Sequence, residues 1–297
     1  MCCDGGVHPE AGRPDDVRPA ALRAVAETVA GEAAAFVRRR RAEVFAPAAA
    51  TPIAVRAKST PTDPVTVVDT ETEDLLRRRL AELRPGDPVL GEEGGSERGA
   101  GAPDTITWVV DPIDGTVNFL YGIPAFAVSV AAQINGVSVA GAVADVAADT
   151  VYSAARGVGA HRRSAAGTEA LHCSSATDLS LALLGTGFGY SAARRRGQAD
   201  LLAQMLPRVR DVRRIGSAAL DLCLVATGAL DGFYEHGLNR WDWAAGALIA
   251  AEAGAQVVIP EPERTGEGAV VIAAAPAVSA DLVDTLAEFG GMAPIAG

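Results

Sequence analysis

The chain has 297 residues, of which 49% are hydrophobic and 21% are charged, and its formal net charge at pH 7 is −11. This length and composition are typical of a globular protein with one large domain or two coupled ones. The acidic balance argues against general nucleic-acid binding, which depends on basic patches. We also expect no membrane segment, because apolar runs such as Ala125–Ala132 are soon broken by polar residues.

Cysteine usage points to a reducing compartment. Cys2, Cys3, Cys173 and Cys223 have neither the density nor the paired spacing of a disulfide framework or a C-x-x-C metal site. The first residues lack the basic region and apolar run of a secretory signal peptide. We therefore expect a cytoplasmic protein.

The first part of the chain predicts a tail and two helices joined by a loop. Residues 1–18 are rich in Gly, Pro and Asp and predict a disordered tail. Residues 20–41 carry apolar side chains at helical spacing and end in a basic cluster. A Pro-rich loop that begins near Lys58 leads through Val65–Val68 to a second helix, with Asp69 at its N-cap position.

Strands dominate the next part of the chain. The apolar run Trp108–Val110 predicts a strand that ends in two aspartates. Residues 125–134, 137–144 and 150–154 predict three further strands, and the Asn-Gly pair between the first two is a strong hairpin signal. Up to about residue 160, the pattern predicts helices followed by an antiparallel meander.

The second half alternates between strands and helices, which places a boundary near residues 160–170. Its predicted strands are 181–184, 212–215, 231–235, 257–259 and 269–274, and its predicted helices are 201–210, 216–227, 239–254 and 279–289. The glycine run 185–189 follows the first of these strands. It lacks both the G-x-G-x-x-G spacing and a Walker lysine, so we do not interpret it as a nucleotide-binding loop.

The motif Asp111-Pro-Ile-Asp114-Gly115-Thr116 carries the clearest chemistry. Two carboxylates at the end of an apolar strand repel each other unless cations neutralise them. Gly115 allows close backbone approach, and amides at a helix start bind anions. Taken alone, the motif could equally be turns and a helix cap. Further apolar runs, however, also end in an acid: Asp69, Glu92, Glu235 and Asp242. Oxygen ligands of this kind suit Mg²⁺ or Mn²⁺ better than Zn²⁺.

In this order, the segments resemble the inositol monophosphatase family, within the superfamily of lithium-sensitive, magnesium-dependent phosphatases. The resemblance covers about residue 20 to the C-terminus and is most specific at Trp108–Phe119 and Trp241–Gly246. Supporting segments are Asp63–Asp69, Gly91–Glu93 and Gly216–Ala218. The resemblance implies a layered α/β fold of alternating helices and sheets. With the boundary above, we expect an α+β part over 19–165 with a large antiparallel sheet, and an α/β part over 166–297 that completes the site.

The resemblance also implies a set of metal ligands. Glu92, Asp111 and the carbonyl of Ile113 would hold a first Mg²⁺. Asp111, Asp114 and Asp242 would hold a second, and Glu92 with Asp69 nearby would bear on a third. Mn²⁺ could substitute for Mg²⁺.

Roles in catalysis and substrate binding follow from the same resemblance. The amides of Gly115 and Thr116 would bind the phosphate, and Lys58 would lie on a mobile loop over the site. Asp69 and Thr116 would position the attacking water, with Glu92 as a candidate base. The remaining substrate contacts would come from Asp114, Ser217, Ala218, Glu235 and Asp242.

The implied function is hydrolysis of inositol monophosphate or a similar polyol or sugar phosphate. We expect direct attack by water, because no Cys, His or Ser nucleophile stands in a recognisable pattern. The partner would be a small-molecule phosphate ester, and the family expectation is a lithium-sensitive homodimer. Two departures from the family pattern, Gly94-Gly95 and Tyr121, leave the exact substrate open.

Two alternatives remain at this point. The first is a phosphatase of the same fold for fructose 1,6-bisphosphate, a nucleoside 3′,5′-bisphosphate, histidinol phosphate or a biosynthetic sugar or aminocyclitol phosphate. The second is a catalytically silent, metal-binding regulatory partner, which the complete set of acids disfavours.

Overall fold

The structure is a computed structural model that describes residues 18–45, 56–57, 64–96, 104–261 and 265–297. Nearly all of the predicted N-terminal tail, with Cys2 and Cys3, lies outside the described residues. So does the loop that carries Lys58. In the described part of the chain, no helix combines the length and the apolar character that crossing a membrane requires.

The first half of the chain builds a large sheet in the order β10-β9-β8-β7-β6-β5-β3-β4. Neighbouring strands are antiparallel except β3 and β5, which are parallel. The strands are β3 (Val89–Gly91), β4 (Gly95–Ser96), β5 (Ile106–Asp114), β6 (Ala127–Ile134), β7 (Val137–Asp145), β8 (Thr150–Ala155), β9 (Gly159–Ser164) and β10 (Gly167–Ala170). The central strands are buried on both faces, which explains their nearly continuous apolar sequences.

Two long helices cover one face of this sheet. Helix α1 (Pro19–Val44) buries Leu22, Ala26, Val29 and Val37 at helical spacing, and α2 (Val67–Leu83) packs beside it. Smaller elements on the same half are the two-stranded sheet β1 (Arg56–Ala57) and β2 (Pro64–Val65), and the short helix α3 (Thr116–Tyr121).

The second half builds a mixed sheet in the order β12-β11-β13-β15-β14. Strand β11 runs parallel to β12 and β13, and β15 runs antiparallel to β13 and β14. The strands are β11 (Leu183–Thr186), β12 (Asp211–Arg213), β13 (Gly232–His236), β14 (Gln256–Val258) and β15 (Val270–Ala274). The helices are α4 (Ala192–Met205), α5 (Ala218–Ala226), α6 (Arg240–Glu252) and α7 (Pro276–Glu288), with short 3₁₀ turns η1 (Leu179–Leu181) and η2 (Leu206–Arg208).

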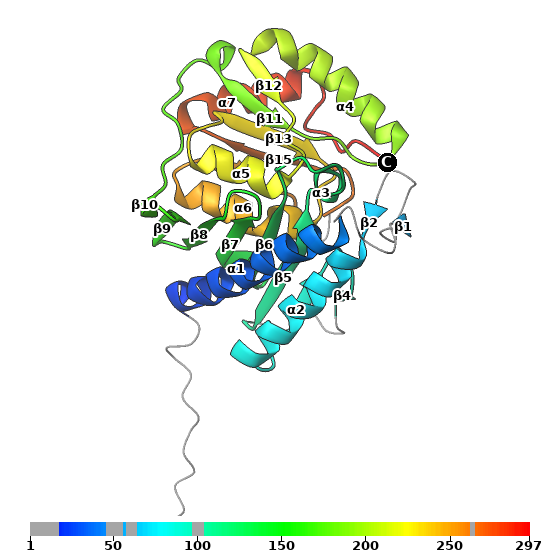
Figure 1. Ribbon diagram of the computed structural model, residues 1–297. Coiled ribbons are helices and arrows are strands. Elements are labelled where there is room, and N and C mark those ends of the chain that lie inside the picture. The colour runs from blue at the N-terminus through cyan, green and yellow to red at the C-terminus, as the bar shows by residue number, and fades with distance from the viewer. Residues whose placement is uncertain (1–17, 46–55, 58–63, 97–103, 262–264) are drawn as a thin grey trace, which may run out of the picture.

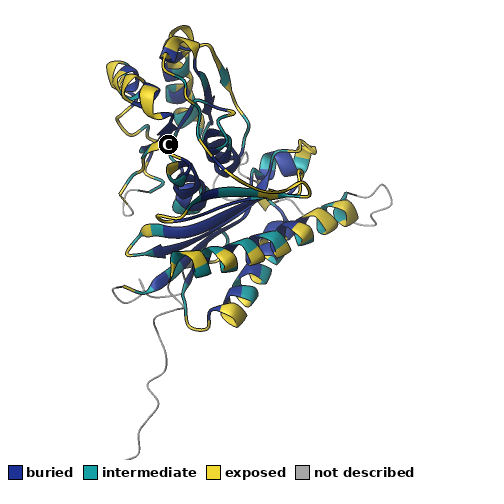
Figure 2. Cartoon of the chain, turned by 90° about the vertical axis from the view of Figure 1, so that its left-hand side faces the viewer, coloured by how far each residue is buried: buried dark blue, intermediate teal, exposed yellow. Residues whose placement is uncertain are grey.

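Helices and sheets alternate in layers, as Figure 1 shows: α1 and α2, the large sheet, α5 and α6, the mixed sheet, then α4 and α7. In Figure 2 the central strands of the large sheet are buried, while the helices that cover it expose their outer faces. The Ala-rich helix α6 lies so close to β7 that a Cβ on Gly141 would be 3.0 Å from the Cα of Ala245. The layered α/β fold implied by the resemblance is confirmed.

Three predictions of local structure were wrong. The helix predicted over 201–210 lies at Ala192–Met205, because its buried residues are few and its first half is rich in Arg. Strands β9 and β10 were missed, since β10 is exposed along its whole length and shows no alternation. The N-cap of α2 is Thr66, and Asp69 is instead the third helical residue of a capping box.

The large sheet ends with β10, and the next strand in the chain, β11, belongs to the mixed sheet. The division of the chain into parts at residues 165 and 166 stays a prediction.

Candidate active site

A bulge at the end of β5 places Asp111 and Asp114 on one side of the strand. Asp111 pairs with Ser129 of β6 and Asp114 pairs with Ala127, so β5 has one extra residue between the two pairs. In a regular strand, side chains three residues apart point to opposite faces. The extra residue reverses this alternation, and Pro112 sits where a strand tolerates proline. The two carboxylates can therefore act together.

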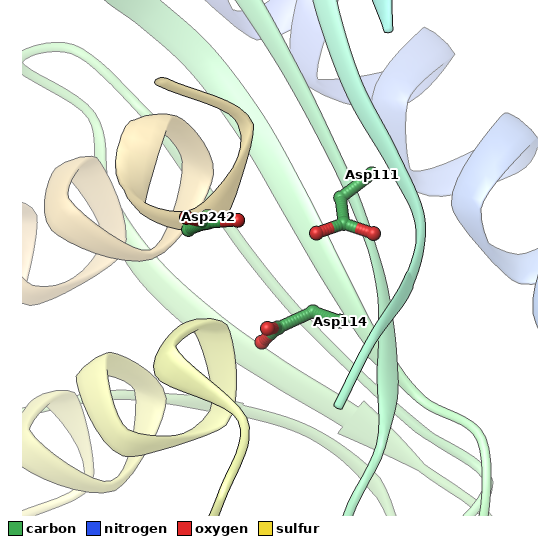
Figure 3. A group of neighbouring side chains, drawn as sticks. All are labelled: Asp111, Asp114 and Asp242. Carbon is green, nitrogen blue, oxygen red and sulfur yellow. The ribbon is translucent and has the colours of Figure 1, made fainter. Parts of the chain in front are cut away.

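The third carboxylate comes from the other half of the chain. Asp242 lies in the first turn of α6, and its Oδ2 accepts a hydrogen bond of 2.6 Å from the amide of Asn239. One carboxylate oxygen of each of Asp111, Asp114 and Asp242 lies within 4.8 Å of the others. Figure 3 shows the three side chains converging from β5 and α6.

The electrostatics of this cluster favour a bound cation. Asp111 is only 2% exposed, and burial raises the pKa of Asp114 to about 6. Burial also raises the pKa of Asp242 well above its usual range, with the charges of Asp114 and Glu92 adding to the effect. Three carboxylates so close together, with little exposure to solvent, are costly when ionised unless a cation offsets their charge.

The donor set fits a hard divalent cation. It consists only of carboxylate oxygens, and ligands about 2.0–2.6 Å from one ion can lie up to about 5 Å from each other. The spacing of the three aspartates lies within that limit. Glu92 and Ile113, the other two predicted ligands, line the same pocket. The described residues thus bring every predicted metal ligand to one place.

Asp114 is held by the start of α5. Its Oδ2 accepts hydrogen bonds from the hydroxyl of Ser217 at 2.5 Å and from the amide of Ala219 at 2.7 Å. Ser217 is also the N-cap of α5, since its Oγ accepts from the amide of Leu220. Ala218 lines the pocket, whereas the Ser217 side chain is directed at Asp114.

A buried chain of hydrogen bonds links Asp69 to Thr116. The Thr116 hydroxyl lies 3.0 Å from the carbonyl oxygen of Ile113 and 3.2 Å from Oδ1 of Asp69, and it donates its proton to one of them. Oδ2 of Asp69 accepts from both the amide and the hydroxyl of Thr66, at 2.9 and 2.5 Å. Asp69 is fully buried, while Thr116 lines the pocket. Asp69 is therefore connected to the pocket by its contact with the Thr116 hydroxyl.

Glu73, which the sequence analysis missed, holds the turn that presents Glu92. Its carboxylate accepts from the amides of Glu93 at 2.7 Å and Gly94 at 2.8 Å, and from Nε of Arg77 at 2.9 Å. A Cβ on Gly94 would lie 2.8 Å from Oε1 of Glu73, so the carboxylate leaves no room for a side chain. This contact accounts for the glycine at this position.

The turn at Gly115 joins the two halves of the site. Gly115 has φ +94°, which glycine adopts without strain, and a Cβ there would lie 3.0 Å from the carbonyl oxygens of Ala125 and Gly216. Asn118 Nδ2 donates to the carbonyl oxygens of Ala125 at 2.8 Å and Ile215 at 2.9 Å. The start of α3 and the loop before α5 are thereby held side by side.

Glu235 lines the same cavity, which has a volume of about 420 Å³. Burial raises the pKa of Glu235 to about 8; the charge of Arg214 opposes this effect and that of Asp114 adds to it. A Cβ on Gly187 would collide with the Glu235 carboxylate, so only glycine fits there. The glycine run 185–189, which the sequence analysis set aside, therefore shapes the cavity without being a nucleotide loop.

The family model for the inositol monophosphatase family matches residues 19–289. The chain belongs to this family. Two relatives, both named inositol-1-monophosphatase, support the assignment along almost the whole length. The one from Mycobacterium leprae is 65% identical over 285 residues, covering 94% of this chain and 98% of the relative. The one from Mycobacterium bovis is 63% identical over 287 residues, covering 95% and 99%.

A solved structure of this inositol monophosphatase family supports the same assignment. Mycobacterium tuberculosis SuhB superposes with a TM-score of 0.80 at 58% identity, covering 94% of this chain and all of that one. Family members are generally metal-dependent, which agrees with the acidic cluster described above.

Proposed function

We propose that the protein is a metal-dependent phosphomonoesterase that hydrolyses inositol monophosphate or a similar polyol phosphate. The observation that carries the proposal is the convergence of Asp111, Asp114 and Asp242 beside the Gly115 turn in one cavity. The names of the mycobacterial relatives, at 63–65% identity, support the same substrate.

Mg²⁺ is the cation that we propose for the site, and Mn²⁺ could replace it. Asp111, Asp114 and Asp242 would hold one ion, and Glu92, Asp111 and the carbonyl of Ile113 would hold another. A third ion near Glu92 and Asp69 stays a prediction. When bound, such cations lower the pKa of a coordinated water and offset charge on the phosphate.

The chain's own residues would orient the attacking water. The Thr116 hydroxyl faces the cavity while its proton goes to Asp69 or to the Ile113 carbonyl. Its free lone pair can then accept a hydrogen bond from water, which fixes the position of the nucleophile. Glu92, on the same cavity wall, is our candidate for accepting the proton.

Substrate binding would use other groups that line the same cavity. The amides of Gly115 and Thr116, at the start of α3, would donate to the phosphate oxygens. Glu235 can accept hydrogen bonds from substrate hydroxyls, and Asp114, Asp242 and the backbone at Ala218 complete the contacts that we propose. A polyol with several hydroxyls matches this set better than an apolar alcohol.

Some further properties stay inferences. We infer a homodimer and inhibition by lithium as family expectations, and a cytoplasmic location from the cysteine usage of the sequence. Lys58 stays a predicted contact over the site, outside the described residues.

The test is phosphate release by the purified protein in the presence of Mg²⁺. We expect turnover of inositol 1-phosphate, loss of turnover with EDTA, and loss with Asp111→Asn while the protein stays folded. A panel with fructose 1,6-bisphosphate, a nucleoside 3′,5′-bisphosphate and histidinol phosphate would show whether another ester is preferred. Absence of hydrolysis of every ester with Mg²⁺ present would overturn the proposal.

A further inference from the structure

Two adjacent arginines, Arg213 and Arg214, have different environments. Arg213, at the end of β12, pairs with Asp211 at 2.6 Å and donates to the carbonyl of Val212 at 3.0 Å. Arg214 begins the loop between β12 and α5 and lines the cavity. Within the described part of the chain, it forms no ion pair with a carboxylate.

The Arg214 side chain lies against Gly216, in the cavity that the Gly115 turn and Glu235 also line. A Cβ on Gly216 would collide with Nη1 of Arg214, so the side chain folds back over Gly216. The carbonyl oxygen of Gly216 in turn touches the Gly115 turn, where we place the phosphate. The charge of Arg214 also opposes the rise that burial causes in the pKa values of Glu235 and Asp114.

The second arginine of the cavity wall has a structural role. Arg194 donates from Nε to the carbonyl oxygen of Ile295 at 3.0 Å and from Nη2 to that of Gly266 at 3.3 Å. These bonds tie α4 to the C-terminal segment. Arg214, by contrast, is exposed and keeps its guanidinium donors available to a ligand in the cavity.

A neutral polyol attached to the reacting phosphate needs no cation at this position. Guanidinium is always charged near neutral pH, and its planar fork matches a phosphate or carboxylate. Hydrogen bonds between such charged groups are the stronger kind in proteins. An unpaired arginine on the wall of a substrate cavity is therefore best explained by an anion that arrives with the substrate.

We propose that Arg214 binds a second anionic group of the substrate, a phosphate or a carboxylate, while the first phosphate occupies the Gly115 turn. The inference rests on the proposed function and narrows its substrate class. The protein would then prefer polyol or sugar esters with two anionic groups, the reacting phosphate and one more, over counterparts that carry the reacting phosphate alone.

Two matched substrate pairs test the proposal with the full chain and Mg²⁺. Inositol 1,4-bisphosphate against inositol 1-phosphate tests a second phosphate, and glucuronic acid 1-phosphate against glucose 1-phosphate tests a carboxylate. We expect the wild type to have a higher kcat/KM for the member with the second anionic group in at least one pair. Arg214→Leu should remove that preference, lowering kcat/KM for this member by about 10- to 100-fold more than for its partner. Arg214→Lys should retain part of the preference.

Arg213→Leu is the matched control, since this neighbour pairs outside the cavity and should leave both substrates unaffected. If the doubly anionic ester is not turned over, its KI against inositol 1-phosphate replaces kcat/KM. Equal losses for both members of each pair, or a wild type without any preference, would overturn the inference. If no ester is hydrolysed, the proposed function fails, and calorimetric binding of the same pairs still decides the role of Arg214.

Discussion

The hydroxyl of Ser217 donates a hydrogen bond of 2.5 Å to Oδ2 of Asp114, across a separation of 103 residues in the sequence. Asp114 ends β5 in the large sheet, and Ser217 caps α5, which packs between the two sheets. Because the amide of Ala219 donates to the same oxygen, that oxygen is fully engaged by the protein. The packing of α5 against the large sheet therefore sets the position of the Asp114 carboxylate.

Replacing Ser217 with alanine should weaken metal binding and stability together. Ser217→Ala removes a helix N-cap and a hydrogen bond to a carboxylate, which together are worth about 1–3 kcal/mol. We expect a lower Tm and a severalfold higher Mg²⁺ concentration for half-maximal activity. Thermal unfolding and a Mg²⁺ titration measure the two effects.

Asp178→Ala provides the control for this prediction. Asp178 caps η1 by accepting from the amide of Ser180, at an exposed position outside the cavity. It should lower stability without changing the Mg²⁺ requirement. An unchanged Mg²⁺ requirement in Ser217→Ala would show that the bond to Asp114 does not position that carboxylate.

Glu73→Gln should lower the affinity for the metal without unfolding the protein. Glu73 accepts the amides of Glu93 and Gly94 with both carboxylate oxygens, and an amide side chain cannot accept with its nitrogen. The turn that carries Glu92 would then lose a bond, and we expect Mn²⁺ to bind about tenfold more weakly. Equilibrium binding of Mn²⁺ measures this directly.

Glu82→Gln, on the same helix, is the matched control. Glu82 pairs with Arg79 at the surface, so its loss should leave Mn²⁺ affinity unchanged. If the Glu73 and Glu82 variants bound Mn²⁺ as tightly as the wild type, the Glu73 contacts would have no part in the metal site.

Glu235 should make the metal-free protein less stable as the pH rises. Its pKa is raised by burial to about 8, above the ordinary value of 4.5, so folding favours the protonated form. The contribution of this group is fully present below pH 4.5 and is lost as the pH rises through about 8. Urea unfolding in EDTA should therefore show that the free energy of unfolding of Glu235→Gln rises relative to that of the wild type between pH 5 and pH 8. A difference that stays constant over this range would contradict the prediction.

The acids that come together in the cavity could be picked out from the sequence, because they stand where strands end or helices begin. Asp111 and Asp242 stand at the end of a strand and at the start of a helix, where the pattern is visible within a few residues. The residues that hold these acids could not be found in this way. Glu73 lies on the buried face of α2 together with Leu76 and Leu80, but only the folded chain brings its carboxylate to the turn at Glu93.

The same limit explains the other omissions. An Arg-Arg pair looks like a solvated surface, and the difference between Arg213 and Arg214 appears only with the cavity in place. The bulge between Asp111 and Asp114 depends on pairing with β6. Gly187 is required because Glu235 comes from a neighbouring strand. These contacts join residues far apart in the sequence, which periodicity and local motifs do not encode.

The most direct test of the central claim is anomalous diffraction from a crystal of the protein grown with Mn²⁺. The account predicts a manganese peak within coordination distance of carboxylate oxygens from Asp111, Asp114 and Asp242, and loss of that peak in Asp111→Asn. Manganese bound only elsewhere, or none at all in a well-ordered crystal, would contradict it.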